Sequence, residues 1–293
     1  MENTSGYDNK NIKVYGGIYE IKTDTEVRFN KAVTLTLKYD EAWLEPGQDI
    51  NDIKIYWYNE RTGSWEYLGG VLDKANKTIS ITLKHLSKYT LGFDEKMLQM
   101  KDMPGRWSYD IVNRLISIGV VNGVKMEDGY YYYPERPITR QEFAKLIVLA
   151  SGVPLADRSE ANYFADVSQI GDWAVPYIAT ATKRQWLKGV PEAAGMSVHP
   201  LRNITRAEAA TVIGRIIEEA GIESESLTQS VFTDLNDVPD WALKYVNLLN
   251  MHEIILGYPD GTFRPNNFIN REEAAAIIAR MLDLFHATGK YLD

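Results

Sequence analysis

The sequence predicts a multidomain protein of α and β structure, in which an antiparallel β-sandwich precedes three helix-loop-helix repeats. Short runs of alternating apolar and polar residues fill the region from Ile18 to Phe93, as in antiparallel strands. Further along, a seven-residue motif occurs three times, as "ITRQEFA", "ITRAEAA" and "INREEAA". Its arginines, Arg140, Arg206 and Arg271, are 66 and 65 residues apart. Such a regular period indicates a repeat architecture.

The composition narrows the functional class. The chain has 293 residues, of which 45% are hydrophobic and 25% charged, so two or more globular domains are expected. A net charge of −8 argues against general binding of nucleic acid or anionic membranes. Without cysteine there are no disulfides and no thiolate metal sites. No apolar run is long enough to span a membrane and the first residues lack a signal peptide, so we expect no membrane insertion.

The N-terminal part is expected to be β structure. Residues 1–17 are polar and predicted to be a flexible segment, and residues 18–95 are predicted to form the sandwich. In "VTLTLKY" Val33, Leu35 and Leu37 share one face, and "RTGSW" indicates a hairpin turn between Tyr58 and Trp65. This spacing predicts about seven strands.

Helical periodicity begins near residue 96 and divides the rest of the chain into repeats at 96–155, 156–222 and 223–293. One helix of each repeat is predicted around a tryptophan, and the other begins at the seven-residue motif. The predicted faces of the first helices are Trp107, Ile111 and Leu115; Trp173, Tyr177 and Ala181; and Trp241, Tyr245 and Leu248.

Each motif copy has the spacing of a capping box, in which an N-cap side chain and a glutamate three residues later satisfy each other's backbone amides. The three boxes are Thr139 with Glu142, Thr205 with Glu208, and Asn270 with Glu273. The arginine of each motif then stands in the first helical turn, where the helix dipole disfavours a cation. The position of this arginine is explained if an anion binds there, because the free backbone amides and the guanidinium group can both donate hydrogen bonds to a carboxylate. The alternatives are a solvated surface charge or a salt bridge across repeats.

The motifs together resemble the S-layer homology family over about residues 100–288. The third repeat contains "FTDL", "DWALKYV", "GYPDGTFRP" and "INREEA"; the second contains "FADV", "DWAVPYI" and "ITRAEA"; the first contains "MPGRWSYDIV" and "ITRQEF". The resemblance implies a pseudo-threefold helical bundle that attaches a surface or S-layer protein to the envelope of a Gram-positive-type bacterium. The implied partner is an anionic, often pyruvylated, secondary cell-wall polysaccharide, with peptidoglycan-linked glycans as a second class. The β region is similar to small domains that precede such modules.

The same resemblance implies the site residues. Arg140, Arg206 and Arg271 would line grooves between repeats and meet the polymer, and the matching groove glycines would be Gly123, Gly189 and Gly257. Trp107, Trp173 and Trp241 could present flat apolar faces to sugar rings. Two alternatives stay open: tryptophans that anchor the core, and glycines that are helix C-caps.

No catalytic or cofactor site is expected. "DLNDVPD" fails as a calcium loop because Pro239 stands at position six and Tyr245 at position twelve, so helix capping by aspartate is preferred. Zincin, nucleophile-elbow, phosphate-loop and dinucleotide motifs are absent. With the extracellular anchoring role that the resemblance implies, we expect a non-catalytic anchoring module. The alternatives are an anchoring fragment of a larger cell-surface polysaccharide hydrolase and a protein–protein module.

Overall fold

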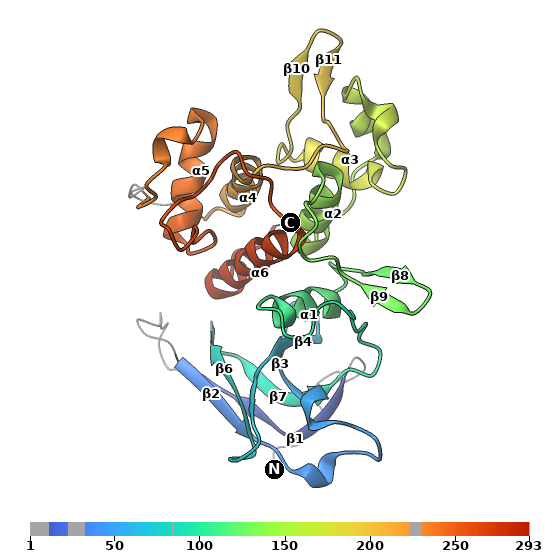
Figure 1. The fold of residues 1–293 in the computed structure, drawn as a ribbon, viewed down its shortest axis with the longest axis vertical. Coiled ribbons are helices and arrows are strands. Elements are labelled where there is room, and N and C mark those ends of the chain that lie inside the picture. Colours follow the sequence, from blue (N-terminus) through green and yellow to red (C-terminus); the bar gives the residue numbers. More distant parts are fainter. Residues whose placement is uncertain (1–11, 23–32, 84, 223–229, 293) are drawn as a thin grey trace. The chain divides into compact units, whose positions relative to one another are not determined.

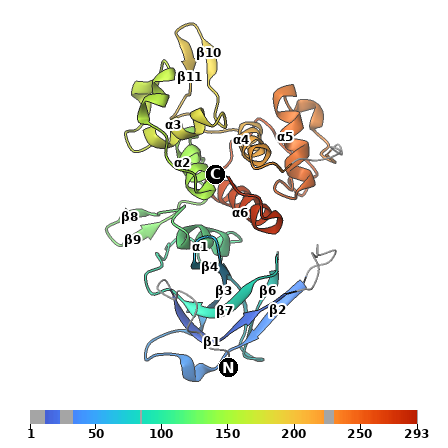
Figure 2. The same ribbon diagram turned by 180° about the vertical axis from the view of Figure 1, so that it is seen from behind.

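The computed structural model describes residues 12–22, 33–83, 85–222 and 230–292. The fold is a mixture of α-helices and small antiparallel sheets (Figures 1 and 2). Its contacts divide the chain into two compact units, Met1–Tyr132 and Tyr133–Asp293.

In the region predicted to be β structure, the first unit contains two antiparallel sheets, and the described residues of that region form seven strands, as expected. One sheet has the order β1-β7-β3-β4 and the other the order β2-β6-β5. The strands are β1 (Lys13–Glu20), β2 (Val33–Lys38), β3 (Lys54–Asn59), β4 (Ser64–Gly69), β5 (Val71–Asp73), β6 (Thr78–Leu83) and β7 (Lys88–Phe93).

The alternation of apolar and polar residues along the strands explains which side chains form the core between the sheets. Leu37 of β2 and Ile79 of β6 are buried in one hydrophobic cluster with Ile55 of β3 and Leu91 of β7, so both sheets contribute to it. The predicted hairpin turn is confirmed, because Tyr58 pairs with Trp65 across β3 and β4. The strand β1 begins at Lys13, within the segment expected to be flexible, because it pairs with β7; residues 1–11 lie outside the described part.

Helix α1 (Tyr109–Ser117), the first helix of the first repeat, belongs to this first unit. The hydroxyl of Tyr67 on β4 donates a hydrogen bond of 2.6 Å to Asp110 Oδ1 of α1. The compact units therefore divide at residue 132, whereas the expected sandwich ends at residue 95; the boundaries of the individual repeats stay a prediction. A short hairpin that the sequence analysis did not anticipate follows α1, formed by β8 (Val124–Met126) and β9 (Gly129–Tyr131).

The second unit holds the remaining helices of the repeats. They are α2 (Arg140–Ser151), α3 (Val175–Lys183), α4 (Arg206–Glu219), α5 (Asp240–Met251) and α6 (Arg271–Thr288). Helices α2, α4 and α6 each begin at the motif arginine, as predicted, and α6 packs against both α2 and α4 (Figure 1). A second unanticipated hairpin, β10 (Val190–Glu192) with β11 (Gly195–Ser197), lies between α3 and α4.

Candidate functional site between the repeats

The three motif copies meet through a closed ring of backbone hydrogen bonds. Ile204 N donates to Ile138 O (3.0 Å), Ile138 N donates to Ile269 O (3.1 Å), and Ile269 N donates to Ile204 O (3.2 Å). All three isoleucines are fully buried. The residue before each capping box is thus fixed to both other copies, which sets the position of the following arginines.

All three capping boxes are confirmed. In the second copy, Thr205 Oγ1 accepts from Glu208 N at 3.3 Å, and Glu208 Oε2 accepts from Thr205 N at 3.0 Å. The other oxygen, Oε1 of Glu208, remains available to groups outside its own helix.

Each motif arginine forms an ion pair with the Oε1 atom of the capping glutamate in the next repeat. Arg140 Nη1 lies 3.1 Å from Glu208 Oε1, Arg206 Nη1 lies 3.6 Å from Glu273 Oε1, and Arg271 Nη1 lies 3.7 Å from Glu142 Oε1. The last pair returns from the third repeat to the first, so the ion pairs also form a closed ring. Of the alternatives to anion binding, the salt bridge across repeats is therefore confirmed, and the solvated surface charge is wrong.

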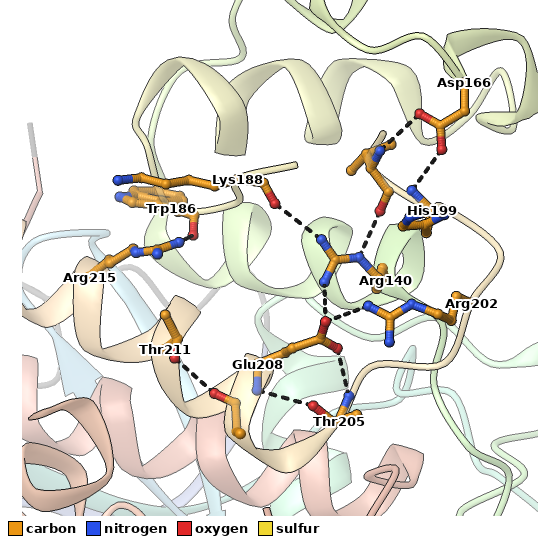
Figure 3. A network of polar contacts seen from close by, with 12 residues as sticks. Arg140, Asp166, Trp186, Lys188, His199, Arg202, Thr205, Glu208, Thr211 and Arg215 are labelled. Carbon is orange, nitrogen blue, oxygen red and sulfur yellow. Dashed lines mark hydrogen bonds and ion pairs between the residues drawn. The ribbon is translucent and has the colours of Figure 1, made fainter. Parts of the chain in front are cut away.

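The guanidinium of Arg140 is surrounded by protein oxygens (Figure 3). Its Nε donates to Val198 O at 2.7 Å and its Nη2 donates to Lys188 O at 3.3 Å, and the side chain is 4% exposed. Burial lowers the pKa of Arg140, and the neighbouring Glu208 opposes that shift. The motif arginine therefore holds the loop of the following repeat as well as its glutamate.

At the next interface, Arg206 also donates to a loop carbonyl, and its guanidinium in addition lies over an aromatic ring. Its Nε donates to Phe263 O at 2.7 Å, and its guanidinium carbon lies 4.6 Å from the ring centroid of Tyr258. The hydroxyl of Tyr258 in turn donates a hydrogen bond of 2.8 Å to Glu273 Oε1. Arg264 stacks on Tyr258 as well, at 4.2 Å.

An aspartate that the sequence analysis did not select supports each of these loops. Asp166 accepts from the amides of Val198 and His199, at 2.8 and 2.7 Å, and Asp234 accepts from those of Phe263 and Arg264, both at 2.7 Å. The helix capping by aspartate expected in this segment is wrong: the Asp234 carboxylate is used on this loop and makes no side-chain cap, and the N-cap of α5 is Pro239.

The first repeat has an equivalent aspartate in a motif whose apolar residues differ from those of the other repeats. Asp102 Oδ1 accepts from Tyr132 N at 2.8 Å, so "MKDM", from Met100 to Met103, stands where the other repeats have "FADV" and "FTDL". The pattern of apolar residue, any residue, aspartate, apolar residue would have revealed it, since methionine replaces phenylalanine and valine.

The predicted glycines lie against these same motifs. A Cβ atom on Gly189 would be 2.8 Å from Phe164 Cε1, and one on Gly257 would be 2.5 Å from Phe232 Cε1. A Cβ on Gly123 would be 2.3 Å from Met100 Sδ. The alternative that they are C-caps is wrong, because the C-caps of α1, α3 and α5 are Ile118, Arg184 and His252. The glycines permit close approach of loop and side chain.

The predicted tryptophans are on the surface. Trp107, Trp173 and Trp241 are 58, 47 and 53% exposed, so the core-anchor alternative is wrong. Trp107 and Trp173 precede their helices and Trp241 is the second residue of α5, so they lie outside the buried helical stripe. Trp173 lies beside α2, where Lys145 Nζ is 5.6 Å from its ring centroid.

The described residues contain no group of three or more histidine, aspartate or glutamate side chains that could hold a metal ion. Nor does any helix among them have the length and apolar character that crossing a membrane requires.

This arrangement defines a class of protein: a helical-repeat module whose repeats are joined by buried arginine–glutamate pairs. The family model for the S-layer homology domain matches residues 99–144, 163–210 and 231–275, so the chain carries three tandem S-layer homology repeats.

Several curated proteins are similar to the chain. An amylopullulanase of Thermoanaerobacterium thermosulfurigenes is 30% identical over 88% of this chain and 13% of its own length. A cellulosome-anchoring protein of Acetivibrio thermocellus is 36% identical over 56% of the chain and 36% of its own length. An S-layer protein of Bacillus thuringiensis subsp. finitimus is 28% identical over 61% of the chain and 21% of its own length. The chain thus spans only a minor part of each relative.

Proposed function

We propose that this chain is a non-catalytic anchoring module, which attaches a surface or S-layer protein to the cell wall of a Gram-positive-type bacterium. The tandem repeats and the relatives named as S-layer and cellulosome-anchoring proteins support a role at the cell surface. The ligand in this proposal is an anionic, pyruvylated secondary wall polysaccharide, with peptidoglycan-linked glycans as a second class. Nucleic acid and the membrane interior are not proposed partners.

The observation that carries the proposal is that arginines gather at the interfaces between repeats, while each repeat also has an exposed tryptophan. Arg140, Arg206 and Arg271 organise the three interfaces, and a pyruvate ketal offers the carboxylate that guanidinium groups prefer. An exposed indole offers an apolar face to a sugar ring. Gly123, Gly189 and Gly257 keep the loops close to the repeat body.

The proposal includes a finer description of the fold. A cluster shared by two antiparallel sheets supports a β-sandwich in the first unit. The closed rings formed by Ile138, Ile204 and Ile269 and by the arginine–glutamate pairs support a pseudo-threefold bundle of the repeats.

A second candidate is that the chain is the anchoring fragment of a larger cell-surface polysaccharide hydrolase. The match to the amylopullulanase favours it, because 88% coverage extends beyond the three repeats into the β region. Both candidates assign the same binding role to this chain and differ in the protein that it would anchor.

Sedimentation with wall sacculi tests the binding role. The protein is expected to pellet with intact sacculi and to stay in solution after the secondary polymer is stripped chemically. Trp173→Ala with Trp241→Ala is expected to weaken pelleting about tenfold, because it removes two exposed indole faces that would pack on sugar rings. Tyr163→Ala, which removes another exposed aromatic side chain, is the matched control. Undiminished pelleting with stripped sacculi would rule out the polymer as the ligand.

A further inference from the structure

The motif arginine of the interface between the first and second repeats is buried and held by protein groups. All three nitrogens of the Arg140 guanidinium contact protein oxygens: Val198 O, Lys188 O and Glu208 Oε1. Because the side chain is 4% exposed, the N–H groups that make no such contact are poorly accessible to an anion. Arg206 is similarly enclosed, with a side chain that is 7% exposed.

A second arginine contacts the same carboxylate from the solvent side. Arg202 Nη2 donates to Glu208 Oε1, and the Arg202 side chain is 39% exposed (Figure 3). Within the described part of the chain, Glu208 is the side-chain partner of this guanidinium, and Arg202 Nε and Nη1 form no further hydrogen bond or ion pair there. Two guanidinium groups therefore share one glutamate, and the outer one keeps donors that face solvent.

The first repeat has the same pair of arginines. Arg136 Nη2 donates to Glu142 Oε1, with a side chain that is 43% exposed, while the more enclosed Arg271 approaches the same oxygen at 3.7 Å. Arg136 and Arg202 both stand four residues before the motif arginine, at the approach to the capping box.

The third repeat departs from this arrangement. Its residue at the equivalent position is Asn267, and the hydroxyl of Tyr258 contacts Glu273 in place of a second arginine. The exposed Arg264 of this repeat is paired with Asp260 at 2.7 Å. The chain therefore contains two interfaces with an outer arginine on the capping glutamate and one without.

We propose that Arg136 and Arg202 are the residues that directly bind the anionic group of the wall polymer, and that Arg140, Arg206 and Arg271 are positioning residues. The inference rests on the proposed function. The capping glutamate holds the outer guanidinium in place before the ligand arrives, which reduces the entropy lost on binding. The planar fork then offers its remaining N–H groups to a carboxylate. The interface at Asn267 binds such a group weakly or not at all.

The test replaces each outer arginine by the residue that the third repeat uses. Arg136→Asn with Arg202→Asn is expected to lower the affinity for intact sacculi at least tenfold, and each single variant to lower it partially. Because exposed ion pairs add little stability, the melting temperature should change by no more than about 4 °C. Asn267→Arg is the reverse variant and is expected to leave binding equal or stronger. Wild-type affinity in the folded double variant would overturn the proposal.

A small carboxylate separates this inference from the proposed function. In a titration with pyruvate, followed through the arginine Nε–Hε signals in NMR spectra of the full chain, Arg136 and Arg202 are expected to shift and Arg140 to stay unchanged. Shifts of Arg140 without shifts of Arg202 would overturn the inference. If the protein still pellets with stripped sacculi, the proposed polymer is wrong, whereas this titration still decides which arginine receives a carboxylate.

Discussion

At the scale of single residues, the three capping glutamates each serve two helices. Glu208 closes the cap of α4 through one carboxylate oxygen and pairs with Arg140 of the preceding repeat through the other. Because a buried guanidinium left without its partner is costly, the same side chain links local helix formation to the joining of repeats.

The ionisation of Glu208 should make stability depend on pH. Burial alone would raise the pKa of Glu208, but Arg140, Arg202 and the Thr205 amide outweigh burial and lower it below 4.5. The folded-state pKa is then below the unfolded one, so the stabilisation is fully present above about pH 4.5 and is lost as the pH falls through the folded pKa. Glu142 shows the same direction.

We therefore predict that Glu208→Gln lowers the free energy of unfolding by about 3 kcal/mol at pH 7, and by less as the pH falls toward 3. Urea denaturation at pH 7, 5, 4 and 3 measures this. Glu253→Gln, at an exposed position, is the matched control. A variant with the wild-type pH slope would contradict the assigned role of Glu208.

A second prediction concerns Gly189. A methyl group there would lie 2.8 Å from Phe164 Cε1 and 3.0 Å from Ser197 O, so Gly189→Ala is expected to destabilise the protein by about 1–3 kcal/mol. Gly17→Ala, whose methyl group would meet only Tyr19 at 3.8 Å, is the control for the change itself. Thermal unfolding compares the two variants, and equal melting temperatures would refute the close-approach argument.

At the scale of elements, local patterns predicted where helices begin, but they did not predict which elements contact each other. The starts of α2, α4 and α6 could be predicted because a capping box is contained in four consecutive residues. The exposure of Trp173 could not be predicted, because helical periodicity does not show that α3 begins only at Val175. The contact of Arg140 with Glu208 joins two helices far apart in sequence, and no local pattern specifies it.

The capping boxes themselves give a test at this scale. Thr205→Ala removes the side-chain acceptor of Glu208 N and is expected to cost about 1 kcal/mol. Thr205→Asn should retain most of the stability, because Asn270 forms the same box in the third repeat. Chemical denaturation of both variants measures the difference. If the asparagine variant lost as much stability as the alanine variant, the box would not be interchangeable between repeats.

At the scale of the whole molecule, the order of a β region followed by helical repeats was predictable from the change of period near residue 96. The position of α1 was not, because its attachment to β4 depends on Tyr67 and Asp110, which are 43 residues apart. Periodicity reports which face of an element is apolar, but it does not report which other element covers that face.

The closed ring distinguishes this module from an open array of repeats. In an open solenoid each repeat contacts only its neighbours, so loss of a terminal repeat leaves the others folded. Here Ile269 O accepts from Ile138 N, and Arg271 pairs with Glu142, so the third repeat also completes the first. Removing it would leave a buried edge and the Glu142 carboxylate without these partners.

We therefore predict that a chain ending at residue 222 does not keep α2, α3 and α4 folded. Its helical circular dichroism should fall well below the share expected for the residues that remain, and the second unit should show no cooperative melting. A chain ending at Leu292, which keeps the buried Leu292 and the contact of Tyr291 with His286, is the matched control and should melt as the full chain does. If the shorter chain retained slow amide exchange in α2 and α4, the repeats would be independent, and the ring would be a consequence of their packing and not its cause.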